Sequence, residues 1–275
     1  MALLQIDSLS RSFGGLQAVR DVGMTVDEAE IVSLIGPNGA GKTTVFNMVT
    51  GFIAPNAGRI LFAGEDIVGL KPHAIAKRGL VRTFQITNVF PGLTVFDNIV
   101  AAHYLKGRVP MWKTWFRDKT VIERERATLE AAKDLLEFLR LGDRRDVTAD
   151  SLAYGELRLL EVAIGLGAEP KMLLLDEPAA GLNDEESARL VALLRDISKL
   201  RGITILLVEH DMNVVMEISD RVVVMNFGEK IAEGTPDEVR RDERVIEAYL
   251  GSDVDVDAVA PADAVEQRRP PGAET

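Results

Sequence analysis

Short apolar runs separated by turn residues fill the N-terminal third of the chain, and this pattern predicts β-strands. We expect short strands before residue 32, with a polar turn at Ser12–Gly15. The run Ile31–Ile35 is apolar apart from one serine, as in a strand buried on both faces. Two further strands are predicted at Gly58–Gly64 and Leu80–Gln85.

Apolar runs alternate with helical periodicity in the last third of the chain. Met172–Leu175 and Ile203–Val208 are typical of buried strands. The helix predicted between them has Asn183 as its N-cap, Glu186 three residues later and Gly202 at its end. This strand, helix, strand order predicts an α/β fold with a mostly parallel sheet.

The middle of the chain, residues 88–168, has a different character, because apolar residues recur there at helical spacing among charged ones. One such helix, which we expect to end at Gly142, is marked by Leu129, Ala132, Leu136 and Leu139. Both tryptophans, Trp112 and Trp115, lie in this region, and we favour their burial over an exposed contact surface. Residues 88–168 are therefore predicted to form a helical subdomain.

These changes divide the chain into three parts. Strands and helices are mixed in residues 1–87 and 169–250, the helical subdomain is inserted between these two segments, and a tail follows. The tail, residues 251–275, has six acidic and two basic side chains, three prolines and no aromatic residue. Low hydrophobicity combined with net charge predicts that this segment is disordered.

Composition narrows the class of protein. With 47% hydrophobic and 27% charged residues, the chain resembles ordinary soluble globular proteins. The absence of cysteine excludes disulfides, thiolate metal sites and thiol catalysis. A net charge of −11 argues against general nucleic-acid binding. Because neither a membrane span nor a signal peptide is evident, we expect a cytosolic chain unless a partner holds it at a membrane.

The glycine-rich segment Gly36–Thr44 carries the strongest chemical signal. It fills the pattern G-x-x-x-x-G-K-[ST] between a predicted strand and a predicted helix, Val45–Thr50. In such loops, glycines let backbone N–H groups surround a polyphosphate at a helix N-terminus. The residues expected to bind a nucleotide are Asn38, Gly39, Ala40, Gly41, Lys42, Thr43 and Thr44. A glycine turn that only joins two elements is the simpler alternative, and the strand and helix context counts against it.

Polar residues follow the predicted strands at the sheet edge where ligands gather in α/β folds. Asp176 would hold Mg²⁺ through its waters, and Glu177 would act as a general base on an attacking water. His210 would bond the γ-phosphate, and Gln85 is a candidate nucleotide contact. Each residue alone has a simpler reading as a capping, solvated or strand-end group. Together with the glycine-rich loop, they predict a hydrolytic nucleotide site.

These motifs, taken in order along residues 3–250, resemble the ATP-binding subunit of an ABC transporter. Gly36–Thr44 resembles the Walker A loop, Gln85 the Q-loop glutamine, and Met172–Glu177 the Walker B strand with its catalytic glutamate. Ala180–Asn183 resembles the D-loop, and His210 the switch histidine. The resemblance implies a P-loop NTPase core, with a mostly parallel sheet flanked by helices, an N-terminal antiparallel β subdomain and an inserted α-helical subdomain.

The resemblance also implies roles for single residues. Phe13, which the residues alone leave open as an exposed aromatic or a minor core anchor, stands where such subunits stack a ring on adenine. Thr43, Gln85 and Asp176 stand at the Mg²⁺ position, and Glu177 and His210 at the catalytic positions. Within the family, the segments most similar to branched-chain (hydrophobic) amino acid importers are Val81–Gln85, Leu152–Glu156 and Leu207–Met212.

The signature motif departs from the family pattern L-S-G-G-Q. Ala153 replaces the serine, Tyr154 the first glycine and Glu156 the glutamine, whereas Gly155 is kept. The lost hydroxyl removes one contact to the partner's γ-phosphate, and Glu156 adds a negative charge near a polyanion. Because the backbone N–H groups of the following helix remain, we expect weaker contact rather than none.

The function implied is ATP hydrolysis that powers uptake of a small solute, such as a branched-chain amino acid. The implied assembly has a second ATPase subunit (the same chain or a paralogue), two transmembrane permease subunits and, indirectly, an extracytoplasmic solute-binding protein. It would lie at the cytoplasmic face of the membrane and use ATP and Mg²⁺. The alternatives are a non-transport ABC ATPase acting on nucleic acid or ribosomes, and the ATPase of a lipid or lipopolysaccharide exporter. The acidic composition counts against the former and the Leu-Ala-Tyr-Gly signature against the latter.

Overall fold

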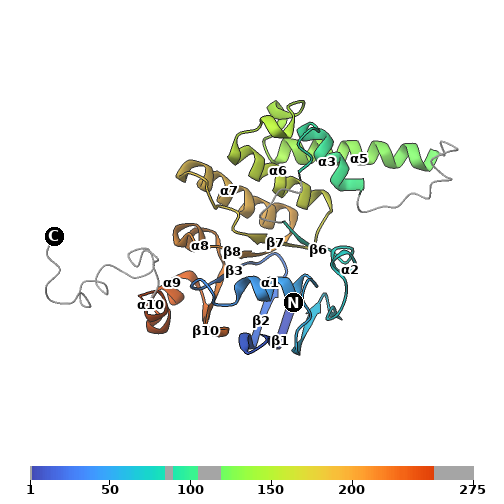
Figure 1. The fold of residues 1–275 in the computed structure, drawn as a ribbon. Helices are drawn as coiled ribbons and strands as arrows, with labels where there is room; N and C mark the ends of the chain where they lie inside the picture. The colour runs from blue at the N-terminus through green and yellow to red at the C-terminus, as the bar shows by residue number, and fades with distance from the viewer. Residues whose placement is uncertain (1, 84–88, 105–118, 251–275) are drawn as a thin grey trace, which may run out of the picture.

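The computed structural model describes residues 2–83, 89–104 and 119–250 (Figure 1). Gln85, Trp112, Trp115 and the tail at 251–275 lie outside the described residues. What the sequence predicts for these positions stays a prediction.

The N-terminal strands form an antiparallel sheet in the order β2-β1-β4-β5. Its strands are β1 (Ala2–Phe13), β2 (Leu16–Asp27), β4 (Ala57–Phe62) and β5 (Glu65–Asp66). The expectation of short strands was wrong, because β1 and β2 have 12 residues each and only Gly14 and Gly15 separate them. The β1–β2 register shifts at several points, and Ser8 and Asp21 have positive φ. These bulges interrupt the alternation of apolar and polar residues without ending the strands.

A second sheet forms the centre of the molecule in the order β10-β9-β3-β8-β7-β6. Its strands are β3 (Ile31–Ile35), β6 (Leu80–Arg82), β7 (Met172–Asp176), β8 (Thr204–Val208), β9 (Arg221–Asn226) and β10 (Glu229–Gly234). All pair in parallel except β10, which is antiparallel to β9. Every residue of β3, β7 and β8 is buried, which explains their continuous apolar runs. The predicted fold class is confirmed.

Helices cover the central sheet, and α3, α5 and α6 gather at the end of the molecule away from β1 and β2 (Figure 1). The helices are α1 (Lys42–Val49), α2 (Pro72–Ala76), α3 (Val95–Tyr104), α5 (Lys119–Phe138), α6 (Tyr154–Gly167), α7 (Asp184–Arg201), α8 (Met212–Ile218), α9 (Pro236–Arg240) and α10 (Glu243–Leu250), with short 3₁₀ turns η1 (Gly142–Arg144) and η2 (Ala149–Ser151). The predicted end of the middle helix at Gly142 was wrong, because α5 ends at Phe138, before the positive φ of Arg140. Leu129 lies in this helix but is exposed, so the buried stripe begins at Ala132.

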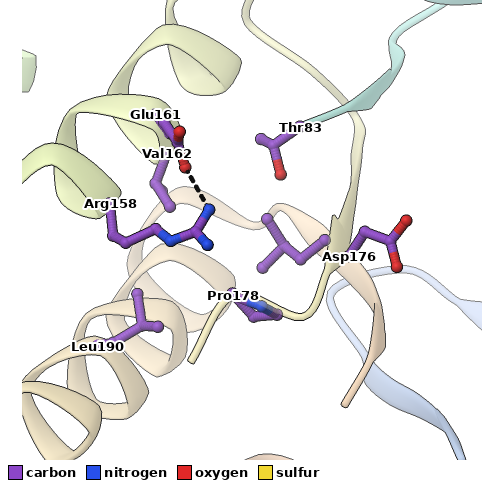
Figure 2. Close-up of a pocket in the computed structure, with 8 residues that line it drawn as sticks. Thr83, Arg158, Glu161, Val162, Asp176, Pro178 and Leu190 are labelled. Atoms are coloured by element: carbon purple, nitrogen blue, oxygen red, sulfur yellow. Dashed lines mark hydrogen bonds and ion pairs between the residues drawn. The ribbon is translucent and has the colours of Figure 1, made fainter. Parts of the chain in front are cut away.

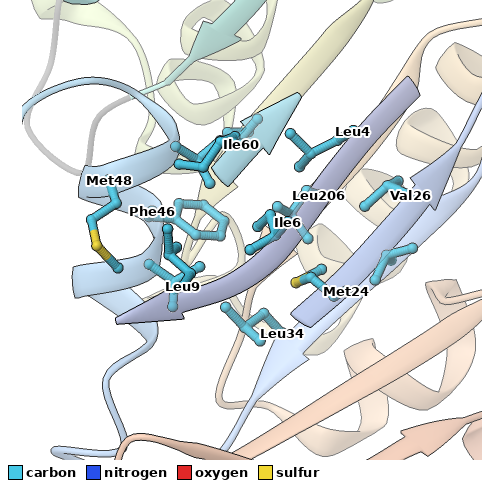
Figure 3. Packing of buried hydrophobic residues seen from close by; sticks show 14 of the residues in the cluster. Leu4, Ile6, Leu9, Met24, Val26, Leu34, Phe46, Met48, Ile60 and Leu206 are labelled. Atoms are coloured by element: carbon cyan, nitrogen blue, oxygen red, sulfur yellow. The ribbon is translucent and has the colours of Figure 1, made fainter. Parts of the chain in front are cut away.

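The main hydrophobic core lies between the antiparallel sheet and the central sheet, with α1 packed into it (Figure 3). Leu4, Ile6 and Leu9 of β1 face this core together with Phe46 of α1 and Leu206 of β8. Burying one such side chain contributes roughly 1.5–3 kcal/mol. Because α1 is held by this packing, the loop that precedes it starts from a fixed position.

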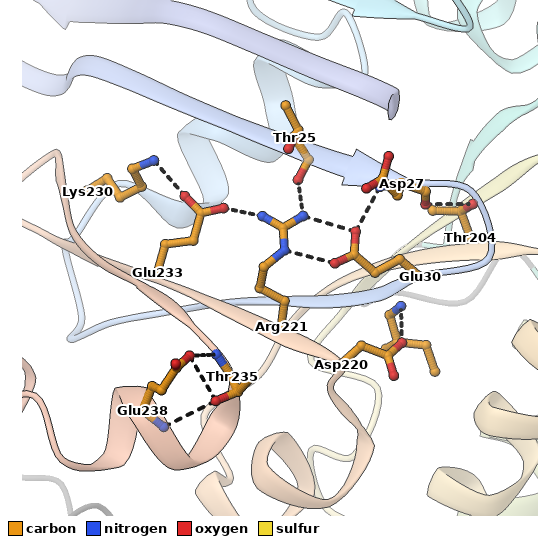
Figure 4. A network of polar contacts seen from close by, with 11 residues as sticks. Thr25, Asp27, Glu30, Thr204, Asp220, Arg221, Lys230, Glu233, Thr235 and Glu238 are labelled. Carbon is orange, nitrogen blue, oxygen red and sulfur yellow. Dashed lines mark hydrogen bonds and ion pairs between the residues drawn. The ribbon is translucent and has the colours of Figure 1, made fainter. Parts of the chain in front are cut away.

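A polar network holds the opposite end of β3, away from that loop (Figure 4). Arg221 donates through Nε to Oε1 of Glu30 at 2.8 Å and through Nη2 to the carbonyl oxygen of Thr25 at 2.6 Å. It also pairs with Glu233 of β10. The hydrogen bond with Glu30 raises the pKa of Arg221, so this guanidinium stays charged while it joins β2, β9 and β10.

Candidate active site

The glycine-rich loop leaves β3 and turns directly into α1, which begins at Lys42 rather than at the predicted Val45. Gly36 and Gly41 have φ of 146° and 102°. A Cβ at Gly36 would lie 2.0 Å from the carbonyl oxygen of Met225, and one at Gly41 would lie 2.5 Å from that of Ala18. Both positions therefore require glycine for conformation and for space.

Lys42, the first residue of α1, is buried, and its ammonium group is bound by the loop itself. Nζ donates to the carbonyl oxygens of Gly36 at 2.6 Å and Pro37 at 3.0 Å. Burial lowers the pKa of Lys42, and the carboxylates of Glu177 and Asp176 oppose this change. The positive charge is thus held at the loop, near Asp176 at the end of β7 and Glu177 directly after it.

A cavity of about 750 Å³ opens in front of the loop, within the usual size range of small-molecule sites. The predicted site residues that line it are Phe13, Asn38, Gly39, Ala40, Gly41, Lys42, Thr43, Thr44, Glu177 and His210. Phe13 is 42% exposed and is therefore no core anchor, and the guanidinium carbon of Arg11 lies 4.8 Å from its ring centroid. Exposed Leu16 and Phe227 also line the cavity and were not identified from the sequence.

Asp176 ends β7 and is engaged in a buried ion pair that the sequence did not reveal. Its Oδ2 accepts a hydrogen bond from Nη2 of Arg82 at 2.6 Å, and both side chains are less than 10% exposed. Nη1 of Arg82 donates to Oδ1 of Asn47 in α1 at 2.7 Å. The available signal was a charged residue within an otherwise apolar strand, β6.

Glu177 and His210, the two predicted catalytic residues, are in direct contact. His210 Nε2 lies 3.0 Å from Glu177 Oε1, and because an ionised carboxylate only accepts, this nitrogen is the donor in that state. Glu177 has a φ of 49°, and its N–H donates to the carbonyl oxygen of Val208 at 2.8 Å. The segments that follow β7 and β8 therefore bring the two side chains together.

Buried Glu209 joins these same two segments and was missed in the sequence. Its Oε1 accepts from the N–H of Ala179 at 2.7 Å, and its Oε2 accepts from the N–H of His210 at 2.9 Å. Burial raises the pKa of Glu209, whereas these backbone donors act in the opposite direction. Glu209 thus fixes the backbone beside Glu177 and His210 without lining the cavity.

The signature residues lie at the start of α6, and none of residues 153–156 lines the cavity. The Tyr154 hydroxyl donates to the carbonyl oxygen of Ala180 at 3.1 Å and accepts from Nη2 of Arg158 at 2.7 Å. A Cβ at Gly155 would lie 2.5 Å from Oε1 of Glu186 in α7. The signature start and the predicted D-loop are therefore packed against each other.

Arg158, which contacts Tyr154, lies between α6 and the end of β7 (Figure 2). Its Nη1 donates to Oε2 of Glu161 at 2.8 Å, and both side chains are largely buried. The pair borders a cavity of about 10 Å³ that Asp176 and Pro178 also line. Helix α6 thus packs directly behind the residues that follow β7.

The negative charge of Glu156 is balanced by Arg144. Its Oε1 accepts from Nε of Arg144 at 2.6 Å, and this hydrogen bond lowers the pKa of Glu156. Its Oε2 accepts from the N–H of Ala153 at 3.2 Å. Because Ala153 offers no side-chain acceptor, the start of α6 is capped from the Glu156 side only.

In the described part of the chain, no group of three or more His, Cys, Asp and Glu residues is arranged to hold a metal ion. Mg²⁺ is commonly held by one or two protein oxygens together with phosphates and waters, so Thr43 and Asp176 suit this ion when a nucleotide supplies the rest. Across residues 2–83, 89–104 and 119–250, no helix combines the length and the apolar character that a membrane span requires.

A phosphate loop, a carboxylate pair and a histidine at one edge of a mostly parallel sheet define a P-loop nucleotide hydrolase. A family model described as ABC transporter matches residues 19–180, and the chain belongs to this family of ATPases. A second model, described as branched-chain amino acid ATP-binding cassette transporter, matches residues 229–255.

Individual relatives agree with this assignment. The chain is 44% identical over 249 residues to the high-affinity branched-chain amino acid transport ATP-binding protein BraF of Pseudomonas aeruginosa, which covers 90% of this chain and 98% of BraF. LivG of Escherichia coli, with the same description, is 43% identical over the same shares of the two chains. A crystal structure of a nucleotide-free ATP-binding cassette from an ABC transporter has a TM-score of 0.79 and 32% identity, and covers 92% of this chain and 100% of its own.

Proposed function

We propose that this ATPase powers uptake of branched-chain amino acids through two separate permease subunits at the cytoplasmic face of a membrane. The likeness to BraF and LivG and the match at residues 229–255 support this solute class. We retain the division into a mixed part (1–87 and 169–250), a helical subdomain (88–168) and a tail (251–275) as part of the proposal. A solute-binding protein outside the membrane would deliver the amino acid to the permeases.

The observation that carries the proposal is that Lys42, Glu177 and His210 line one cavity. In our account, the phosphates of ATP lie on the backbone N–H groups of the loop, and Lys42 exchanges its carbonyl acceptors for phosphate oxygens. Phe13, which lines the same cavity, stacks on adenine. The cavity then holds the nucleotide with its terminal phosphate toward Glu177.

Hydrolysis follows from the position of Glu177. Its carboxylate accepts a proton from a water molecule as the water oxygen bonds to the γ-phosphorus. The bond from that phosphorus to the bridging β–γ oxygen breaks, and ADP and phosphate result. His210, 3.0 Å from Glu177, orients the carboxylate and contacts the γ-phosphate. Glu209 keeps the two residues in register through the backbone.

Mg²⁺ fits the oxygen donors of this site, and Thr43, Gln85 and Asp176 are the residues that would hold it. When bound, the ion would neutralise charge on the phosphates. Arg82 contributes independently, because its bond to Asp176 fixes one oxygen of that carboxylate.

A second ATPase subunit completes the site in this proposal. The signature residues Ala153, Tyr154, Gly155 and Glu156 lie outside the chain's own cavity and would face the nucleotide of the partner. Packing of Tyr154 against Ala180 would make the signature and the D-loop move together when the two subunits close.

The transport role is tested by purifying the full chain with its membrane partners and reconstituting the complex in vesicles. We expect ATP enclosed in the vesicles to drive accumulation of leucine inside them, but not of lysine. Lys42→Ala, which removes the phosphate-binding cation, should abolish accumulation, whereas Arg78→Ala, a distant surface change, should preserve it. Recovery of ribosomes or nucleic acid with the chain, in place of membrane proteins, would contradict the proposal.

A further inference from the structure

Arg144 lies outside the predicted motifs and contacts one of them, the signature segment, through Glu156. It lies in η1, whose backbone is held by a hydrogen bond from the Arg144 N–H to the carbonyl oxygen of Leu141 at 3.0 Å. The Val147 N–H donates to the carbonyl oxygen of Arg144, also at 3.0 Å. The guanidinium therefore projects from a fixed turn, and its Nε reaches Oε1 of Glu156 at 2.6 Å.

The other oxygen of Glu156 is also engaged, by the N–H of Ala153 at 3.2 Å. The carboxylate is thus bound between η1 and the start of its own helix. In this arrangement one carboxylate oxygen pairs with Arg144, and the other contacts the backbone at the start of α6. The partner residue lies 12 positions earlier in the chain, which is why the pair is not visible as a local motif.

A negative charge in the first turn of α6 would affect how this helix attracts the phosphates of ATP. The helix N-terminus presents unpaired backbone N–H groups and a partial positive charge that attract phosphate. An unbalanced carboxylate in that turn would offset this attraction and repel a triphosphate. A glutamine, as in the general signature pattern, would carry no such charge.

We propose that Arg144 is a positioning residue for the signature segment. It neutralises Glu156 and holds its carboxylate against the start of α6, so that this helix can approach the γ-phosphate of ATP bound by a second subunit. The inference rests on the proposed two-subunit ATPase and adds a residue to it.

The pair is suited to this role rather than to stabilising the fold. Its side chains are 49% and 28% exposed, and exposed ion pairs of this kind contribute little to folding stability. The electrostatic field of these two side chains can act on a nearby polyanion without burial, but salt screens it. A salt-dependent change in the rate of ATP hydrolysis, with little change in folding stability, therefore separates the proposed role from a structural one.

The test compares wild type, Arg144→Ala, Glu156→Gln and the double variant by steady-state ATP hydrolysis of the full chain in complex with its second ATPase subunit and its membrane partners. The net charge of the pair is zero in wild type and in the double variant. It is −1 in Arg144→Ala and +1 in Glu156→Gln. At low ionic strength we expect kcat to fall about threefold to tenfold in Arg144→Ala, to rise in Glu156→Gln and to recover in the double variant. These differences should shrink at high salt, and KM for ATP should change less than kcat because each chain's phosphate loop is intact.

Arg78→Ala is the matched control, because it removes an arginine from another exposed ion pair, with Glu65, that includes no residue of the signature. Arg144→Lys keeps the charge and should hydrolyse faster than Arg144→Ala. Equal kcat for wild type and Arg144→Ala at low salt would overturn the inference. So would a loss in Arg144→Ala that Glu156→Gln does not restore or that salt does not reduce. Absence of hydrolysis in wild type would instead refute the proposed function on which the inference depends.

Discussion

Two arginine–carboxylate pairs, each with a carboxylate from a predicted site residue, have the same nitrogen–oxygen distance but differ in how far they are buried. Arg82 and Asp176 are 2.6 Å apart with 9% and 8% of their side chains exposed. Arg144 and Glu156 are also 2.6 Å apart, but with 49% and 28% exposed. Bond length alone therefore says little about what an ion pair does.

The difference lies in what each arginine joins. Arg82 links β6, β7 and α1, and its guanidinium carbon lies 5.7 Å from the ring centroid of Phe46 in the main core. Arg144 links a surface turn to the first turn of a helix. We therefore expect Arg82 to act mainly on folding and Arg144 mainly on the rate of the proposed reaction.

The largest effect on stability is predicted for Arg82→Ala. This change leaves the buried carboxylate of Asp176 without its cation, which should lower the free energy of unfolding by about 3–5 kcal/mol. Chemical denaturation of the nucleotide-free chain measures it. A loss below that of Arg78→Ala, which breaks an exposed pair, would show that burial is not what distinguishes the two pairs at the site.

A smaller loss is predicted for Tyr154→Phe, because Tyr154 is 48% exposed and the change removes no charge. The change removes the hydrogen bond to the carbonyl oxygen of Ala180 and the acceptor for Arg158, and should cost about 1–2 kcal/mol. Unfolding curves of both forms provide the measurement. An unchanged free energy of unfolding would mean that the signature start is not fastened to the D-loop through this hydroxyl.

The smallest change in stability is predicted for Arg144→Ala, despite its effect on hydrolysis. Exposed ion pairs contribute little to folding stability, and added salt should reduce even this contribution. Thermal unfolding at two salt concentrations is the measurement. A loss as large as that of Arg82→Ala would contradict the contrast drawn between the two pairs.

The sequence reveals what is local in the chain and hides what depends on tertiary contacts. The phosphate loop, the acids after β7 and the capped start of α7 are contiguous patterns, and the structure contains each of them. Arg82 and Asp176 are 94 residues apart, so no local pattern joins them. The bulges in β1 and β2 concealed the length of both strands for a different reason, because they break the period on which strand prediction relies.

We propose that Glu177 is the general base in the hydrolysis of a nucleotide held by the loop at Gly36–Thr44. The direct test measures ATP binding and ATP hydrolysis on the same preparations of wild type and Glu177→Gln. We predict that binding is kept and that hydrolysis falls at least about a hundredfold, because glutamine cannot accept the proton of the attacking water. Hydrolysis by Glu177→Gln at the wild-type rate would contradict the account.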